Sequence, residues 1–243
     1  GVGKTSIAVN LALTMAMMGS RVALFDADFG LANSHLLLGL KPEKTLKDSL
    51  ESTNLSDVTM TGPHGLKLFS GGNGLVEMLN LDQKTRYNVI RGFDPIADDC
   101  DVFFIDTPAG ASDSALTFIN ASDKILIVLV GEPTSFMDAY TLVKAASLEG
   151  GAKEFSIVVN MADSEKHSME IFNKFKMTVM RFLNVNLNYA GYLPQSRTLR
   201  NSIITRKPMV LNNSRSREAL LIKSMSKELL RSQNNSPSGI KFF

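Results

Sequence analysis

Four continuous apolar runs, each as long as a strand, constrain the fold of this 243-residue chain more than any other feature. They read RVALFD (21–26), DVFFID (101–106), KILIVLVG (124–131) and FSIVVN (155–160). An apolar run without polar alternation predicts a strand that is buried on both faces, as in a parallel sheet. Shorter apolar stretches predict weaker strands at 66–70 and 189–194.

Segments with helical periodicity lie between these runs, at 5–18, around 81–93, and at 134–148, 164–183 and 214–231. The alternation of strand and helix predicts an α/β fold: a doubly wound, mostly parallel sheet with helices on both faces and right-handed crossovers. We expect one domain over residues 1–231. Residues 232–239, SQNNSPSG, have the composition of a flexible linker.

The composition excludes some classes of site and favours an anionic partner. The single cysteine, Cys100, excludes an internal disulfide framework and a cysteine metal cluster, and it favours a reducing cytoplasm. Residues 195–243 hold ten Lys and Arg against two Asp and Glu, whereas residues 1–194 hold 16 against 22. This asymmetry points to a membrane or nucleic acid near the C-terminal part, although a solvated helix face explains it equally well.

The chain begins with GVGKTS, directly before a long apolar helix. A phosphate-binding loop needs glycines so that backbone N–H groups converge on phosphate oxygens, a lysine that reaches the β- and γ-phosphates, and a Ser or Thr for Mg²⁺. We therefore predict a nucleotide site here, and we expect a strand and the first half of the loop ahead of it. The predicted binding residues are Gly1, Val2, Gly3, Lys4, Thr5 and Ser6.

Two further strands end in acidic clusters. Asp106 closes one buried run and is followed by a loop that ends at Gly110, which places a carboxylate near Mg²⁺ and an amide near the γ-phosphate. Asp26 and Asp28 close another run, two residues apart. Each aspartate alone could be a turn or cap residue. Three clusters at strand ends in one chain predict nucleotide hydrolysis instead.

GVGKT, DADFGLAN and IDTPAG, in this order, resemble the deviant Walker A ATPases of the MinD/ParA class. Within this class, GLANSHLLLGL, SGGNG, EPTSFMDAYTLVKA and VVNMA are similar to the FlhG (FleN) branch, which controls flagellar number and placement. The family loop reads KGGVGKT, so its first Lys, which reaches the partner's phosphates in an ATP-sandwiched dimer, is expected just before Gly1. Two departures are His35, where the family has Asp or Asn, and LPQS (193–196), which replaces a Pro-x-Asp-like pattern near the adenine.

The resemblance implies ATP and ADP as ligands, with Mg²⁺. Lys4 and the loop amides would hold the β- and γ-phosphates, while Thr5 and, through water, Asp106 would hold Mg²⁺. Asp28 would orient the attacking water, and Asp26 would support the site and the Mg²⁺ shell.

Adenine contacts are assigned to Asn160 and Pro194, although a turn role explains these two residues equally well.

The resemblance also implies an ATP-dependent homodimer that acts as a switch. Its partners would be a flagellar transcription activator, flagellar C-ring proteins or the FlhF GTPase. We expect a cytoplasmic protein that associates peripherally with the inner membrane, at the cell pole, with residues 239–243, GIKFF, beginning a membrane-targeting segment.

Three alternatives stay open at this point. A ParA-type partition ATPase would coat nucleic acid with its basic face, and a MinD-type ATPase would select the division site. A nucleotide-binding regulatory module would act without significant turnover.

Overall fold

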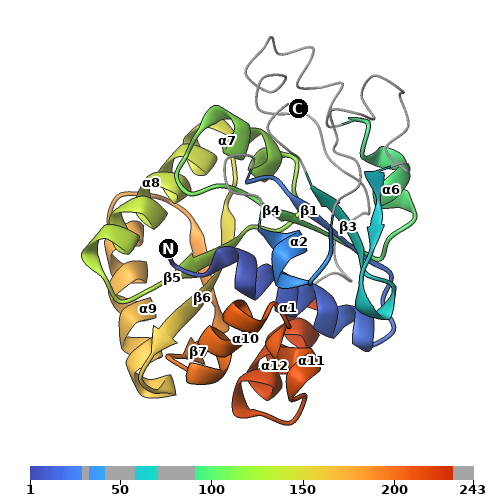
Figure 1. Cartoon of the computed structure of the whole chain (residues 1–243). Helices are drawn as coiled ribbons and strands as arrows, with labels where there is room; N and C mark the ends of the chain where they lie inside the picture. The colour runs from blue at the N-terminus through green and yellow to red at the C-terminus, as the bar shows by residue number, and fades with distance from the viewer. Residues whose placement is uncertain (29–32, 42–57, 71–90, 232–243) are drawn as a thin grey trace.

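The computed structural model describes residues 1–28, 33–41, 58–70 and 91–231, and its strands form two sheets. The first has the order β2-β3-β1-β4 and the second the order β5-β6-β7. Every pairing is parallel except that of β2 with β3 (Figure 1). The strands are β1 (Val22–Asp26), β2 (Met60–Thr61), β3 (Lys67–Ser70), β4 (Val102–Asp106), β5 (Leu126–Leu129), β6 (Glu154–Ala162) and β7 (Asn186–Pro194).

Helices cover both faces of the strands, which confirms the predicted doubly wound α/β fold. On one face lie α1 (Lys4–Met17), α11 (Met209–Asn212) and α12 (Arg217–Arg231), and α10 (Arg197–Thr205) contacts α11. The other face carries α6 (Asp94–Asp98), α7 (Asp113–Asn120), α8 (Pro133–Glu149) and α9 (Glu165–Met180). The short helices α2 (Ser34–Leu37) and η2 (Pro63–Gly65) follow β1 and β2.

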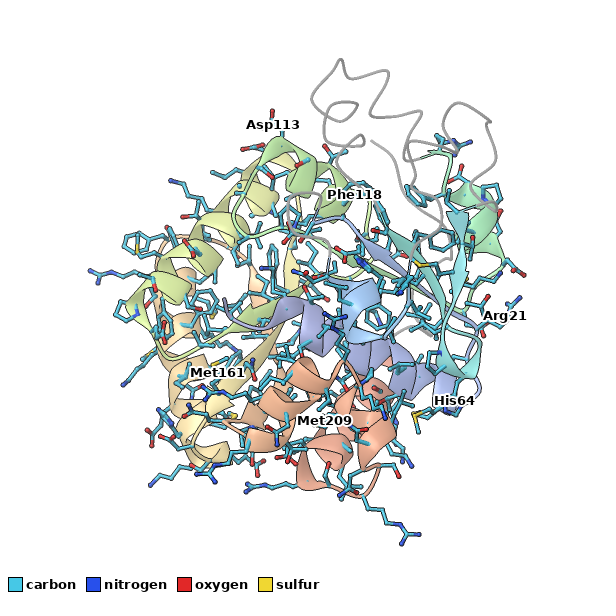
Figure 2. All side chains as sticks on the ribbon, in the orientation of Figure 1. Arg21, His64, Asp113, Phe118, Met161 and Met209 are labelled. Carbon is cyan, nitrogen blue, oxygen red and sulfur yellow. The ribbon has the colours of Figure 1, made fainter. Side chains whose placement is uncertain are left out.

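Side chains of β1 alternate between the two helical layers. Leu24 packs in the core beneath α1, whereas Phe25 packs on the opposite side. There the Phe25 and Phe118 rings meet edge to face, with centroids 5.5 Å apart, and Figure 2 labels Phe118 on α7. Because both faces are covered, both sets of side chains must be apolar, which explains the continuous apolar runs.

Most predicted elements are present within a few residues of their expected bounds. The helix expected around 81–93 lies almost entirely outside the described residues. The helices α2, α6, α7, α10 and α11 and the short strand β2 were not predicted, and only the second half of β7 was. The first residues of β7, Asn186–Asn188, alternate in polarity because Leu187 is buried while the two asparagines are exposed. No helix among the described residues is long and apolar enough to cross a bilayer.

A seam separates β4 from β5, since each is the last strand of its own sheet. The first four residues of β4 are apolar and only partly buried, whereas every residue of its neighbour β1 is buried. A cavity of about 220 Å³ lies in the seam; Ile105 of β4, Ile127 of β5 and Gly1 line it. A strand placed in this seam would have an edge to pair with on each side.

We therefore predict that a strand of about five β-branched residues, joined ahead of Gly1, will stabilise the protein by filling the seam. The melting temperature should rise by several degrees, and the amides of β4 and β5 should exchange more slowly. A Gly/Ser extension of equal length is the control, because it adds chain without apolar side chains. Equal melting temperatures for the two extensions would contradict the assignment of the seam.

Candidate functional site

The pairing of β1 with β4 places two buried carboxylates at the carboxyl edge of the sheet. Asp26 and Asp106 are partners in the parallel register, and their exposed fractions are 1% and 5%. Ala27, the residue after β1, donates a hydrogen bond from its amide to the carbonyl oxygen of Asp106 at 2.9 Å. The register therefore brings two of the predicted site residues together.

Asp26 organises the turn that follows β1. Its Oδ1 accepts a hydrogen bond from the Asp28 amide at 3.2 Å, and its Oδ2 accepts one from the Ser34 amide at 2.8 Å. Burial raises the pKa of Asp26, and these hydrogen bonds partly offset that rise. Asp26 thus positions the backbone of Asp28 and has a structural role in the site. The contribution of Ser34 was not predicted, because backbone donors leave no signal in a sequence.

Asp106 is the most strongly perturbed acid of the site. Burial raises its pKa from an ordinary value of 3.8 to about 6, and the nearby charges of Asp26 and Asp28 add to the rise. The Thr5 side chain and the Lys4 ammonium act in the opposite direction. These influences are short-ranged, so the predicted phosphate-loop and aspartate residues lie around one carboxylate.

The GVGKT loop is held against β6. Gly3 has φ 89°, in the left-handed region, and α1 begins at the next residue. The Asn160 Nδ2 donates a hydrogen bond to the Val2 carbonyl oxygen at 2.8 Å. Since Gly3 has no side chain, the first N–H groups of α1 receive no cap from it, and a helix N-terminus of this kind favours an anion.

Lys4 and Gly110 line the same cavity in the seam, together with Val2 and Thr107. Gly110 has φ 88°, a conformation that favours glycine in the loop after β4. The fold therefore brings the predicted lysine and the predicted glycine amide to one hollow.

The predicted adenine residues lie on the neighbouring strands β6 and β7. Asn160 is buried and supports the loop through Nδ2, while its Oδ1 has no hydrogen-bond partner among the described residues. Pro194 pairs with Ala162, so it ends β7 at the same edge of the sheet. Met161 follows Asn160 on β6; it has φ 58°, and its side chain is exposed (Figure 2). Met161 was not predicted as a site residue, because a methionine does not indicate a left-handed backbone conformation.

The residues present fit a Mg²⁺-nucleotide. Asp106 Oδ2 is buried without a hydrogen-bond partner in the described part of the chain, so it has an oxygen available for a cation or its water. Residues 1–28, 33–41, 58–70 and 91–231 contain no group of three or more His, Cys, Asp or Glu that could hold a metal. Mg²⁺ usually needs only one or two carboxylates when phosphates and water supply its other ligands, so one carboxylate and Thr5 are sufficient.

A left-handed glycine ahead of a helix, a lysine, and two carboxylates at the ends of adjacent parallel strands define a P-loop nucleotide-binding protein. The family model described as "ParA: NUBPL iron-transfer P-loop NTPase" matches residues 1–230. The chain belongs to the ParA family.

Relatives and solved structures agree with this assignment. The chain is 37% identical over 230 residues to "Antiactivator FleN" of Pseudomonas aeruginosa, covering 94% of this chain and 82% of that protein. It is 28% identical to "Flagellum site-determining protein YlxH" of Helicobacter pylori, covering 85% and 70%. These two relatives agree with the predicted FlhG (FleN) branch.

Two solved structures share the fold. The MinD cell division protein of Aquifex aeolicus has a TM-score of 0.74 at 20% identity, covering 98% of this chain and 95% of that one. The septum site-determining protein MinD of Pyrococcus horikoshii OT3, complexed with Mg-ADP, has a TM-score of 0.74 at 18% identity, covering 96% and 93%. At these identities the likeness concerns the fold alone.

Replacing Gly3 with alanine tests the loop geometry. The new Cβ would lie 2.6 Å from Asn160 Nδ2, in addition to the strain of a positive φ. Gly19→Ala is the matched control, because Gly19 has φ 95° and open space around its Cβ position. The strain alone should cost Gly19→Ala about 1 to 2 kcal/mol of stability, and Gly3→Ala should lose more because of the added contact. Only Gly3→Ala should weaken ATP binding, as measured by calorimetry. Equal ATP affinity in the two variants would contradict the role of the Asn160 contact.

The raised pKa of Asp106 makes a prediction for stability against pH. Below about pH 4 both folded and unfolded chains hold the proton, and between about pH 4 and pH 6 only the folded chain holds it, so stability falls as pH rises through this range. At pH 7 the charged form costs the folded protein on the order of 2 to 3 kcal/mol. Asp106→Asn should therefore raise the melting temperature of the nucleotide-free protein at pH 7 and should change it less at pH 4. Destabilisation at pH 7 would contradict the prediction.

Proposed function

We propose that this protein is a Mg²⁺-dependent ATPase that switches between a monomer and an ATP-bound homodimer and regulates flagellar number and placement. The observation that carries the proposal is the convergence of Lys4, Thr5 and Asp28 around the buried Asp106. The similarity to the antiactivator FleN and to the flagellum site-determining protein YlxH supports the flagellar role.

Binding depends on the loop and on α1. The amides from Gly1 to Thr5 donate to phosphate oxygens, and the Lys4 ammonium neutralises charge on the β- and γ-phosphates. The Thr5 hydroxyl would hold Mg²⁺ directly, and Asp106 would hold it through water. When bound, Mg²⁺ would neutralise charge on the phosphates and favour the ionised form of Asp106, because a nearby cation lowers the pKa of a carboxyl group.

Asp28 orients the water that attacks the γ-phosphate, and Asp26 holds the backbone of Asp28 through the hydrogen bond to its amide. Phosphoryl transfer depends mainly on positioning and charge stabilisation. We therefore expect slow turnover in a monomer, in which no second subunit contributes a cation to the phosphates.

Adenine contacts come from Asn160 and Pro194 at the ends of β6 and β7. The buried Oδ1 of Asn160, which has no hydrogen-bond partner among the described residues, supports this assignment as an acceptor for the exocyclic amine.

The γ-phosphate orders the turns after β1 and β4, and this change favours the dimer. The dimer recruits a flagellar transcription activator, C-ring proteins or the FlhF GTPase. The protein works in the cytoplasm and associates reversibly with the inner membrane at the cell pole, where residues 239–243 begin the anchor.

Lys4→Ala and Asp28→Ala should each lower the ATP turnover rate about 100-fold or more, because each removes a charge that acts on the transferring phosphoryl group. Lys4→Ala should also weaken ATP binding, whereas Asp28→Ala should bind ATP normally and accumulate as a dimer. Asp98→Ala is the control, since Asp98 is exposed on α6 and precedes β4 at the opposite edge of the sheet. Phosphate release measures the turnover rate, and light scattering with ATP and with ADP measures dimer formation.

A wild-type protein that binds ATP but shows no turnover, even with lipid and a partner present, would favour the regulatory module. The flagellar role needs a cellular test: deletion of the gene should change the number or position of flagella, and the Asp28→Ala variant should not restore them. Normal flagella after deletion would remove the flagellar role and leave the ATPase assignment intact.

A further inference from the structure

A stretch of the sequence that includes α10 and the turn after it contains basic residues and no acidic ones. From Ile171 to Arg217 the sequence contains nine Lys and Arg and no Asp or Glu. Glu218, the first carboxylate after this stretch, accepts a hydrogen bond from the Ser196 hydroxyl, so it is engaged in capping the start of α10. α10 itself contains no acidic residue, and Glu218 reaches its first turn only through Ser196.

α10 is amphipathic, with one face docked and the other in solvent. Leu199 packs against the core beneath α1, and the buried Ser202 donates a hydrogen bond to the Leu199 carbonyl oxygen at 2.7 Å. On the opposite side, Arg200 and Ile204 lie four residues apart and are both exposed. The helix thus presents cations and an aliphatic side chain on one outer face.

Two isoleucines are exposed within this basic surface. Ile203 is 48% exposed and Ile204 is 71% exposed. The helix ends at Arg206, which has φ 54° and stops the helical path, and buried Pro208 and Met209 then hold the chain in place. The exposed Arg206 and Lys207 are therefore fixed beside the isoleucines, and α10 lies with α11 and α12 below α1 in Figure 1.

Within the described residues these cations are not used in ion pairs, which suits them to an external partner. Among the described residues, no ion pair involves Arg197, Arg200, Arg206 or Lys207. A nucleic-acid backbone would neutralise them but would leave the isoleucines without an apolar partner. An anionic bilayer surface satisfies both groups, because headgroup phosphates contact the cations and the acyl boundary accepts the aliphatic side chains.

We propose that the outer face of α10, together with the Arg206–Lys207 turn, docks on anionic phospholipid. We call this surface the α10 face; it comprises Arg197, Arg200, Ile203, Ile204, Arg206 and Lys207. It is separate from the C-terminal segment proposed above as an anchor, and it needs neither nucleotide hydrolysis nor the flagellar role. A bilayer contact of this kind is weak alone, so two contacts give more stable attachment than one.

Sedimentation of the full chain with phosphatidylglycerol–phosphatidylcholine vesicles tests the α10 face, with pure phosphatidylcholine vesicles as the reference. Arg200→Gln/Arg206→Gln should weaken binding about 25-fold, since each cation near an anionic surface contributes about fivefold. Ile203→Ser/Ile204→Ser keeps every charge and should weaken binding about tenfold. ATP turnover without lipid should be unchanged in both variants.

Matched controls come from α9, which lies in the layer on the opposite side of the sheet. Lys166→Gln/Lys174→Gln removes two exposed cations, and Met177→Ser/Met180→Ser replaces two exposed apolar side chains. Both should bind vesicles like the wild type. Phe242→Ser/Phe243→Ser alters the C-terminal segment alone, so its effect reports on the proposed anchor and leaves the α10 face to be judged by its own variants.

Wild-type binding that is equal on both kinds of vesicle, or isoleucine variants that bind like the wild type, would overturn the proposal. The proposal would also be overturned if the isoleucine variants changed only the molar mass in light scattering. The surface would then be an interface between two copies of this chain. The proposal would likewise be overturned if the arginine variants bound vesicles like the wild type but lost binding to duplex DNA in a gel-shift assay. The surface would then be a nucleic-acid interface.

Discussion

The in-register parallel pairing of β1 with β4 is the constraint on which the site depends. It places Asp26 and Asp106 side by side at the carboxyl edge, where both are buried. Two carboxylates in this position are costly unless hydrogen bonds or a cation compensate them. Backbone amides compensate Asp26, whereas one oxygen of Asp106 has no hydrogen-bond partner in the described chain. The ionised form of Asp106 therefore carries an electrostatic penalty that a bound cation would relieve.

The loop that faces this pair is held by a contact from the second sheet. Asn160 of β6 donates to the Val2 carbonyl oxygen and lies where any side chain at residue 3 would be. Because α1 packs on both sheets, the helix, the loop and the two carboxylates share one framework.

Strongly periodic or uniformly apolar segments were predictable, because local pattern decides them. The runs that became β1, β4, β5 and β6 are almost continuously apolar, and the helices α1, α8, α9 and α12 lie within a few residues of the predicted helical segments. α10 was not predictable in this way, because most of its side chains are polar and only Leu199 and Ser202 face inward. Its helical conformation depends on the Ser196 cap and on tertiary docking. For the same reason the polar first half of β7 was missed.

The sequence alone determined the kind of chemistry: a glycine-lysine-threonine cluster before an apolar helix and aspartates at strand ends point to phosphate and Mg²⁺ wherever they meet. Only the tertiary structure decided how they meet. The strand register sets which carboxylate is buried without a partner, and Asn160, distant in the chain, fixes the loop. The physical reason is that burial and the local field depend on neighbours that are far apart in sequence, so residue type gives the chemistry and packing gives its pKa and its geometry.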